Sequence, residues 1–129
     1  MQYRVQIKRI NSDFEEEILI QIHNIELMCF VGCWEKNVKE GHFYDVDIHI
    51  TILDELEMKE QDEEITGFKQ IGDSFAYIIR GKLEFDTHTI DAGLLMEFDP
   101  SELSDYSYLD GKYVSARVDR IALDFIPKT

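Results

Sequence analysis

Three polar side chains that could carry chemistry alternate along one predicted strand. Asp45, Asp47 and His49 occupy every second position, so they share one face, with neighbours about 7 Å apart. Two carboxylates and an imidazole at that spacing could bind a metal ion or form an acid–base pair. The same pattern is typical of the solvated face of a half-buried strand, and no further ligand lies nearby in the sequence. We therefore expect neither a metal site nor catalytic residues here.

The two cysteines are a second candidate for chemistry. Cys29 and Cys33 would lie about 13 Å apart on an extended strand, which is too far for a disulfide between them. We expect both to point inward as free thiols, which indicates a reducing compartment such as the cytoplasm. A reactive Cys33 would need cationic neighbours, and Glu35 together with the net charge argues against that. With no glycine-rich phosphate loop and no nucleophile elbow, the chain is predicted not to be an enzyme and to need no cofactor.

The charge balance is unusual, with 27 acids and 13 bases giving a formal net charge of −14. Such an excess disfavours direct binding of nucleic acid or an anionic membrane and favours basic protein partners. Solubility alone is the alternative explanation. No apolar run is long enough for a membrane span, and the N-terminus lacks the apolar core of a signal peptide.

Two segments are candidates for binding a basic partner. The first holds seven acids between residues 54 and 64 and is expected to be an exposed loop or a frayed helix. The second is a group of tyrosines with acidic neighbours, in which aromatic rings would supply contact energy and carboxylates would steer the partner. The alternative is that these tyrosines cover one end of a barrel. The candidate residues are Asp54, Glu55, Glu57, Glu60, Asp62, Glu63, Glu64, Tyr106, Tyr108 and Tyr113.

The elements that must position these residues are predicted to be strands, because apolar side chains recur at every second position. One short helix is expected near residues 100–105, since Asp99 can cap it, Pro100 suits its first position and Glu102 has capping-box spacing. The predicted strands cover residues 3–7, 18–33, 44–52, 75–85, 90–98 and 113–125, with 75–85 and 90–98 forming a hairpin.

In two long segments the buried parity reverses, at His23–Asn24 and at Asp119–Arg120. A reversal indicates a β-bulge, or a strand that bends and changes the sheet it serves. We therefore expect a corner at Asp119–Arg120, and Gly81 in mid-strand suits the same curvature. A strand that is buried on both faces is the alternative.

The segments "YIIRGKLEFDTHTIDAGLLMEF", "DPSEL" and "LDGKYVSARVDRI" together resemble an OB fold. The resemblance implies a small, mostly antiparallel barrel, although the helix precedes the final strand here, so a β-sandwich is the competing fold. The expected fold is thus all-β, in one domain spanning residues 1–129. An OB fold would bind oligonucleotides through aromatic and basic residues. The bases expected to approach one another are too few for that, namely Arg80, Lys82, Arg117 and Arg120.

In length, charge and lack of catalytic motifs the chain is similar to the small immunity proteins that neutralise bacterial toxins. That resemblance implies a non-enzymatic inhibitor whose acidic surface imitates the nucleic-acid substrate of a basic nuclease. A barrel that binds a small ligand or peptide is the alternative, with a cavity lined by Phe75, Tyr77, Ile79 and Met96. A metal-dependent enzyme is a third alternative. Exposed edge strands would also permit a homodimer.

Overall fold

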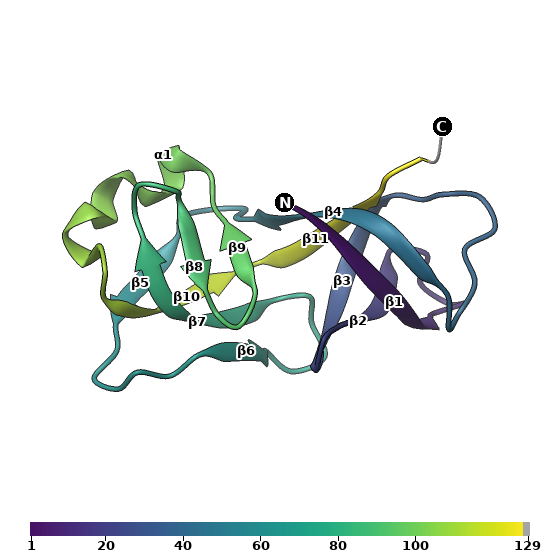
Figure 1. The fold of residues 1–129 in the computed structure, drawn as a ribbon, viewed down its shortest axis with the longest axis horizontal. Coiled ribbons are helices and arrows are strands. Elements are labelled where there is room, and N and C mark those ends of the chain that lie inside the picture. The colour runs from purple at the N-terminus through teal and green to yellow at the C-terminus, as the bar shows by residue number, and fades with distance from the viewer. Residues whose placement is uncertain (128–129) are drawn as a thin grey trace. The chain divides into compact units, whose positions relative to one another are not determined.

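The computed structural model describes residues 1–127, and its contacts divide the chain into two compact units (Figure 1). The barrel unit comprises Met1–His49 and Ile121–Thr129, and the sheet unit comprises Ile50–Arg120. The chain therefore leaves the barrel unit after His49 and returns to it at Ile121. That both units fold as a single domain stays a prediction.

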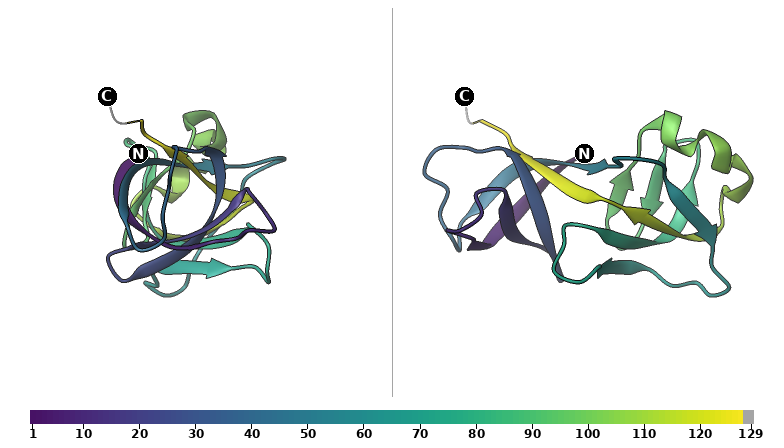
Figure 2. Two further views of the ribbon diagram at one scale, coloured as in Figure 1. Left: turned by 90° about the vertical axis from the view of Figure 1, so that its right-hand side faces the viewer. Right: turned by 180° about the vertical axis from the view of Figure 1, so that it is seen from behind.

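The barrel unit is a closed barrel with the strand order β1-β2-β3-β11-β4, and β4 pairs with β1 (Figure 2, left). The pairs β1–β2, β2–β3 and β1–β4 are antiparallel, whereas β3 and β11 are parallel. Closure gives each of these strands two neighbours. The strands are β1 (Gln2–Ile10), β2 (Glu17–Ile22), β3 (Ile25–Cys33), β4 (Phe43–Thr51) and β11 (Arg120–Phe125).

Alternating apolar side chains fill the barrel, which is why these period-two segments form strands. At one end of the barrel the Trp34 ring stacks on Phe125 with ring centres 5.4 Å apart, and Tyr44 meets Phe125 edge-on. The side chains that are at most 2% exposed include Val5, Ile7, Ile18, Ile20, Leu27, Val46, Ile48, Ile121 and Leu123.

The sheet unit is a six-stranded sheet with the order β5-β10-β7-β8-β9, in which β6 also pairs with β7. The pairs β5–β10, β10–β7, β6–β7, β7–β8 and β8–β9 are all antiparallel. A four-residue helix, α1 (Pro100–Leu103), runs directly into the 3₁₀ helix η1 (Ser104–Leu109). The strands are β5 (Glu57–Glu60), β6 (Gly67–Gln70), β7 (Tyr77–Glu84), β8 (Thr89–Asp91), β9 (Leu95–Glu97) and β10 (Tyr113–Val118).

The parity reversal at His23–Asn24 is a hairpin turn, so segment 18–33 is two strands and the prediction of one long strand was wrong. Ile22 pairs with Ile25 across the turn, and His23 takes a positive φ of 53°. Because an even residue pairs with an odd one, the buried parity must reverse from β2 to β3. Segment 90–98 is also two strands, but Ile90 pairs with Met96, so the turn leaves no such trace in the sequence.

The parity reversal at Asp119–Arg120 is a change of sheet, as predicted. Residues up to Val118 pair with β5 and β7 in the sheet unit, and residues from Ala122 pair with β3 in the barrel. Asp119 lies between β10 and β11, and it forms hydrogen bonds with the last residue of β4 and with the loop that follows. Its backbone N–H donates to the Thr51 carbonyl oxygen at 3.1 Å, and its carboxylate accepts from the Leu53 N–H at 2.8 Å.

The predicted helix start is confirmed. The Asp99 carboxylate accepts hydrogen bonds from the backbone N–H of Ser101 at 2.9 Å and from its hydroxyl at 2.8 Å. Both bonds favour the ionised form and lower the pKa of Asp99, the backbone bond most. The predicted hairpin of 75–85 with 90–98 is confirmed by the β7–β8 pairing.

The predicted all-β fold, mostly antiparallel and with one short helix, is confirmed. The residues that carried the OB-fold resemblance, 77–121, lie almost wholly in the sheet unit, whereas the closed five-stranded barrel is built from residues 1–51 and 120–125. None of the helices in residues 1–127 has the length and apolar character needed to cross a bilayer.

Candidate functional site

The acidic segment 54–64 contains a strand, so the expectation of a loop or frayed helix was wrong for its central part. Leu56 and Met58 are buried at 2% and 8% exposure, while Glu57 and Lys59 between and beside them are exposed. This alternation allows residues 57–60 to join the sheet as β5 while presenting charged side chains to solvent. The strong excess of carboxylates hid a period-two pattern that only two apolar residues carry.

β5 stands at one end of the sheet order and pairs there with β10. Glu60 lies opposite Val114, and Glu57 lies opposite Arg117. Glu60 also forms an ion pair with Lys112 at 3.6 Å. All seven acids of the segment are exposed, so the strand carries its charges at a terminal position of the sheet.

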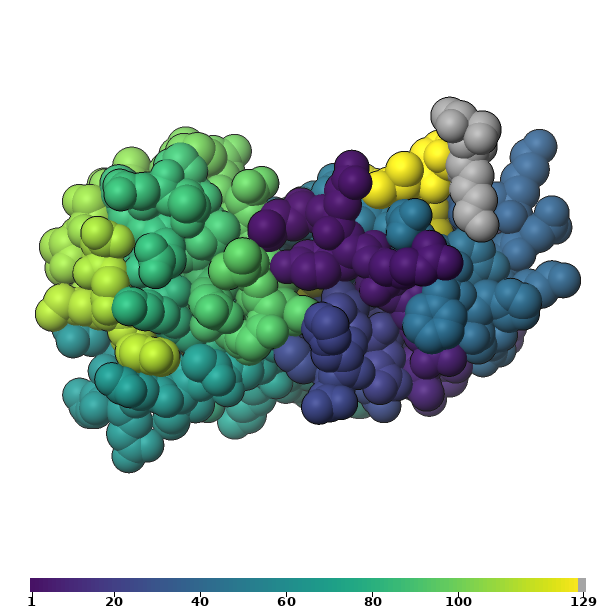
Figure 3. Space-filling view, viewed as in Figure 1, coloured from purple at the N-terminus to yellow at the C-terminus, as the bar shows by residue number. Residues whose placement is uncertain are grey.

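The structure brings two of the three predicted tyrosines to the acidic segment. The Tyr106 hydroxyl donates to the Leu56 carbonyl oxygen at 2.7 Å, and the Gln61 N–H donates to the Tyr113 carbonyl oxygen at 2.8 Å. Tyr108, in η1, is 69% exposed. In the space-filling view, yellow-green atoms of the chain around residue 110 adjoin teal atoms of the chain around residue 60 (Figure 3).

We use the name acidic–tyrosine surface for the ten predicted residues taken together. Its two halves are about fifty residues apart in the sequence, and the Tyr106–Leu56 hydrogen bond joins them directly. Because η1 is tied to the residue before β5, the tyrosines and the carboxylates are held on one unit instead of on independent loops. The arrangement can offer exposed aromatic area beside dense negative charge.

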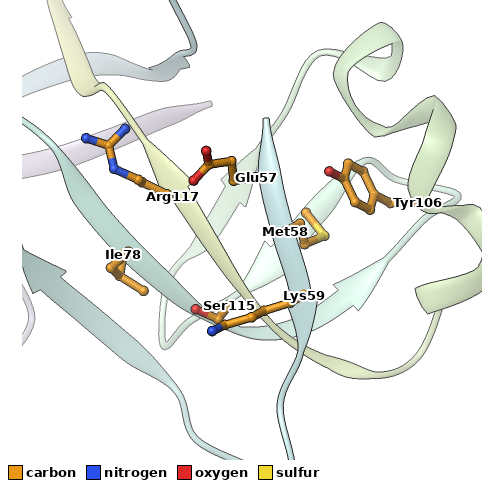
Figure 4. Close-up of a pocket in the computed structure, with 7 residues that line it drawn as sticks. All are labelled: Glu57, Met58, Lys59, Ile78, Tyr106, Ser115 and Arg117. Atoms are coloured by element: carbon orange, nitrogen blue, oxygen red, sulfur yellow. The ribbon is translucent and has the colours of Figure 1, made fainter. Parts of the chain in front are cut away.

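A pocket of about 450 Å³ opens next to this surface (Figure 4). β5, β7, β10 and η1 all contribute to its wall. Lys59 and Ser115 extend toward each other in the figure, and Tyr106 and Met58 lie together on another side. The lining residues are Glu57, Met58, Lys59, Ile78, Tyr106, Ser115 and Arg117.

The sheet also places basic residues together, which the sequence indicated only in part. Arg80, Lys82 and Arg117 lie on the face of the sheet opposite to the buried residues of β7 and β10. The register adds Lys59 and Lys69 to the same face. Arg120, which was expected to join them, begins β11 instead. Alternation on each strand was the available signal, but the partner strands and their register could not be read from the sequence.

Comparison with known proteins decides the family. The family model described as uncharacterised conserved protein UCP019853 matches residues 1–126. The chain belongs to this family. The matched span includes both units, and no curated protein or solved structure matches the chain. The description of this family names no activity.

Asp45, Asp47 and His49 are engaged with neighbouring groups in the barrel unit. Arg4 forms an ion pair with Asp45 at 3.1 Å, and the N-terminal ammonium group forms one with Asp47 at 3.0 Å. The His49 Nδ1 lies 4.0 Å from carboxylate oxygens of both Asp47 and Asp124. Within residues 1–127 no group of three or more ligating side chains is placed to hold a metal ion.

The remaining candidates for chemistry are mostly core residues. Cys29 is buried, and desolvation raises its pKa well above the ordinary range for a thiol. Cys33 is exposed, so the expectation that it points inward was wrong: it ends β3, at a register shift opposite Asp124. Of the residues expected to line a cavity, Tyr77, Ile79 and Met96 are at most 3% exposed and contribute to the core.

Proposed function

We propose that this chain is a non-enzymatic, cytoplasmic interaction module that binds a basic protein through the acidic–tyrosine surface. The proposal follows the resemblance to bacterial immunity proteins and identifies the partner by its chemistry, as a cationic surface such as that of a nucleic-acid-binding toxin. One observation carries it: the Tyr106–Leu56 hydrogen bond ties η1, which bears Tyr106 and Tyr108, to the residue that precedes the acidic strand β5.

The distribution of charge supports the proposal. Residues 50–120 hold seventeen acids and seven bases, whereas the rest of the chain holds ten acids and six bases. The sheet unit therefore carries most of the net negative charge. Its field would accelerate encounter with a cationic protein, while disfavouring nucleic acid and anionic membranes as direct partners.

The exposed aromatic area supports it as well. Charges at the rim of an interface set the rate and orientation of encounter, and buried aromatic anchors supply much of the lasting affinity. Tyr108, at 69% exposure, has ring area to bury, and the half-buried Tyr106 is already fixed by its hydrogen bond. The pre-ordered ring would lose little rotamer entropy on binding.

The proposal can be tested by affinity capture from the native lysate at low and high salt, with captured proteins identified by mass spectrometry. The test variant neutralises three exposed acids after β5: Asp62→Asn, Glu63→Gln and Glu64→Gln. The matched control makes the same change of charge in the barrel unit, at three other exposed acids: Asp13→Asn, Glu15→Gln and Glu16→Gln.

We expect basic proteins to be captured at low salt and released at high salt, because screening weakens exposed charge pairs. The variant after β5 should bind at least about tenfold more weakly, and the control should bind nearly as well as the natural chain. Equal loss in both variants would mean that only net charge matters. Capture of neutral or acidic proteins irrespective of salt would contradict the proposal.

A further inference from the structure

Five of the seven bases of the sheet unit lie on one face of its sheet. These are Lys59, Lys69, Arg80, Lys82 and Arg117. None of the five is a direct cross-strand partner of another, because Ile78, Ser115 or Tyr113 stands between them. The same face also carries carboxylates, at Glu57 opposite Arg117 and at Asp91 opposite Lys82, whereas no carboxylate stands directly opposite Lys59 or Arg80.

The closest arrangement of donors is a row across three strands. Ser115 on β10 lies directly opposite Lys59 on β5 and, on its other side, directly opposite Arg80 on β7. With strands about 4.8 Å apart, the Cα atoms of Lys59 and Arg80 are about 10 Å apart, and long side chains can converge over the serine. Arg117 lies two residues further along β10, on the same face.

The three side chains of the row have hydrogen-bond donors available for a ligand. In residues 1–127, neither Lys59 nor Arg80 has a carboxylate partner, and the Ser115 hydroxyl has no hydrogen-bond partner. Arg117 is shared with Asp119, whose carboxylate lies 3.5 Å from its guanidinium nitrogen, and Glu57 is its cross-strand neighbour. Lys59, Ser115 and Arg80 are therefore the groups that can serve an external anion without breaking an existing ion pair.

The row continues into the pocket of about 450 Å³, whose wall includes Lys59, Ser115 and Arg117. That volume lies within the range of small-molecule sites. Ile78 adds apolar surface on the same face of the sheet as the row, and Tyr106 and Met58, whose side chain belongs to the opposite face of β5, complete the lining (Figure 4). A ligand with an anionic head and an organic body would place the head at the row and the body against Ile78, on the same face of the sheet.

We propose that Lys59, Ser115 and Arg80, with Arg117 beside them, form a binding site for a small molecule that carries a phosphate group. A phosphate offers three oxygens and up to two charges, so an ammonium, a hydroxyl and a guanidinium can bind it together. The ligand is small because a polyanion would meet the field of the whole unit, whereas a monophosphate responds mainly to the nearby cations. The pocket shares Glu57 and Tyr106 with the acidic–tyrosine surface, but the row of Lys59, Ser115 and Arg80 takes no part in the proposed function, so either proposal can fail alone.

The test is to titrate the isotopically labelled full chain separately with inorganic phosphate, adenosine monophosphate and adenosine. The chemical shifts of the backbone amides are monitored by NMR in each titration. We expect saturable shifts at residues 59, 80 and 115 with both phosphates. The nucleotide should bind more tightly than inorganic phosphate because its organic part contacts the pocket wall. Adenosine alone should shift none of the three residues at the same concentration.

Variants separate the site from general electrostatics. Lys59→Gln and Ser115→Ala should each weaken nucleotide binding, with about a tenfold loss for the lysine. Lys69→Gln is the matched control, since it removes the same charge from the same face outside the pocket wall, and it should bind nearly normally. All three positions face outward, so the variants should keep the natural NMR dispersion.

Three results would overturn the inference. The first is absence of saturable shifts at residues 59, 80 and 115 with either phosphate. The second is an equal loss of binding in Lys69→Gln and Lys59→Gln, which would indicate only a diffuse positive field. The third is tighter binding of a single-stranded oligonucleotide than of the mononucleotide, which would assign the face to a polymer.

Discussion

Every strand of the barrel unit has two neighbours, whereas β5, β6 and β9 of the sheet unit each have one. The barrel unit carries ten acids and six bases, and the sheet unit carries seventeen acids and seven bases. The unit whose strands form a closed barrel thus carries the smaller net charge, and the unit with terminal strands carries the larger one. Charged side chains on a terminal strand also discourage pairing between copies of the chain. In the proposed function, the sheet unit is therefore the part that would contact the basic partner.

The largest expected effect tests whether these two units are energetically one domain. Leu27→Ala in the barrel and Leu83→Ala in the sheet both remove side chains that are 0% exposed. Each should lower the free energy of unfolding by about 2–5 kcal/mol. Trp34, the single tryptophan, lies in the barrel unit, so its fluorescence during urea unfolding reports that unit alone.

If the chain is one domain, Leu83→Ala shifts the Trp34 transition as well as the transition in circular dichroism. An unchanged Trp34 transition in Leu83→Ala would show that the barrel unfolds by itself. The two units would then be separate folding domains.

The next effect compares two glycines that face close neighbours. A Cβ at Gly81 on β7 would collide with the backbone carbonyl of Asp91, which the β7–β8 pairing holds in place. A Cβ at Gly32 on β3 would lie 2.6 Å from the Asp124 carboxylate oxygen, which is part of a movable side chain. Gly81→Ala should therefore cost about 1–3 kcal/mol or more, and Gly32→Ala clearly less.

Thermal unfolding of the two glycine variants, measured side by side, checks this order. If Gly32→Ala lost more stability than Gly81→Ala, β7 and β8 would be able to move apart at little cost in free energy. The barrel would then be the unit that cannot accommodate an added methyl group. The sheet unit would then be the more adaptable of the two.

The smallest effect concerns the cap of α1. Hydrogen bonds from Ser101 depress the pKa of Asp99 in the folded chain, so its stabilising contribution is present above the ordinary carboxyl pKa. The contribution is lost as the pH falls from that value through the lower folded pKa. Asp99→Ala should be slightly less stable than the natural chain near neutral pH.

Urea unfolding at neutral and at strongly acidic pH measures this difference. The gap between the two proteins should close at acidic pH. A gap of the same size at both pH values would show that the carboxylate charge plays no part in the cap.

The sequence predicts the local features of this fold better than its long-range pairing. The helix cap at Asp99 and the change of sheet at Asp119–Arg120 were predictable because each leaves a mark within a few residues. The turn near Gly93 left no mark, since its two strands keep one parity. β5 was missed because carboxylates surround Met58, its one buried residue, and Leu56 just before it.

The candidate sites depend on pairing that no local pattern contains. The ten residues of the acidic–tyrosine surface were identified from composition, but the bond from Tyr106 to Leu56 spans fifty residues. The row of Lys59, Ser115 and Arg80 needs the register of three strands, each from a different part of the chain. Parity predicts which face a side chain takes, but not which strand lies beside it.

Hydrogen exchange of the full chain, alone and saturated with a captured basic partner, tests the central claim most directly. If the acidic–tyrosine surface is the binding surface, exchange slows in β5, in residues 61–64 and in η1, while the barrel strands exchange as before. Slower exchange confined to the barrel strands, with β5 and η1 unchanged, would contradict the account.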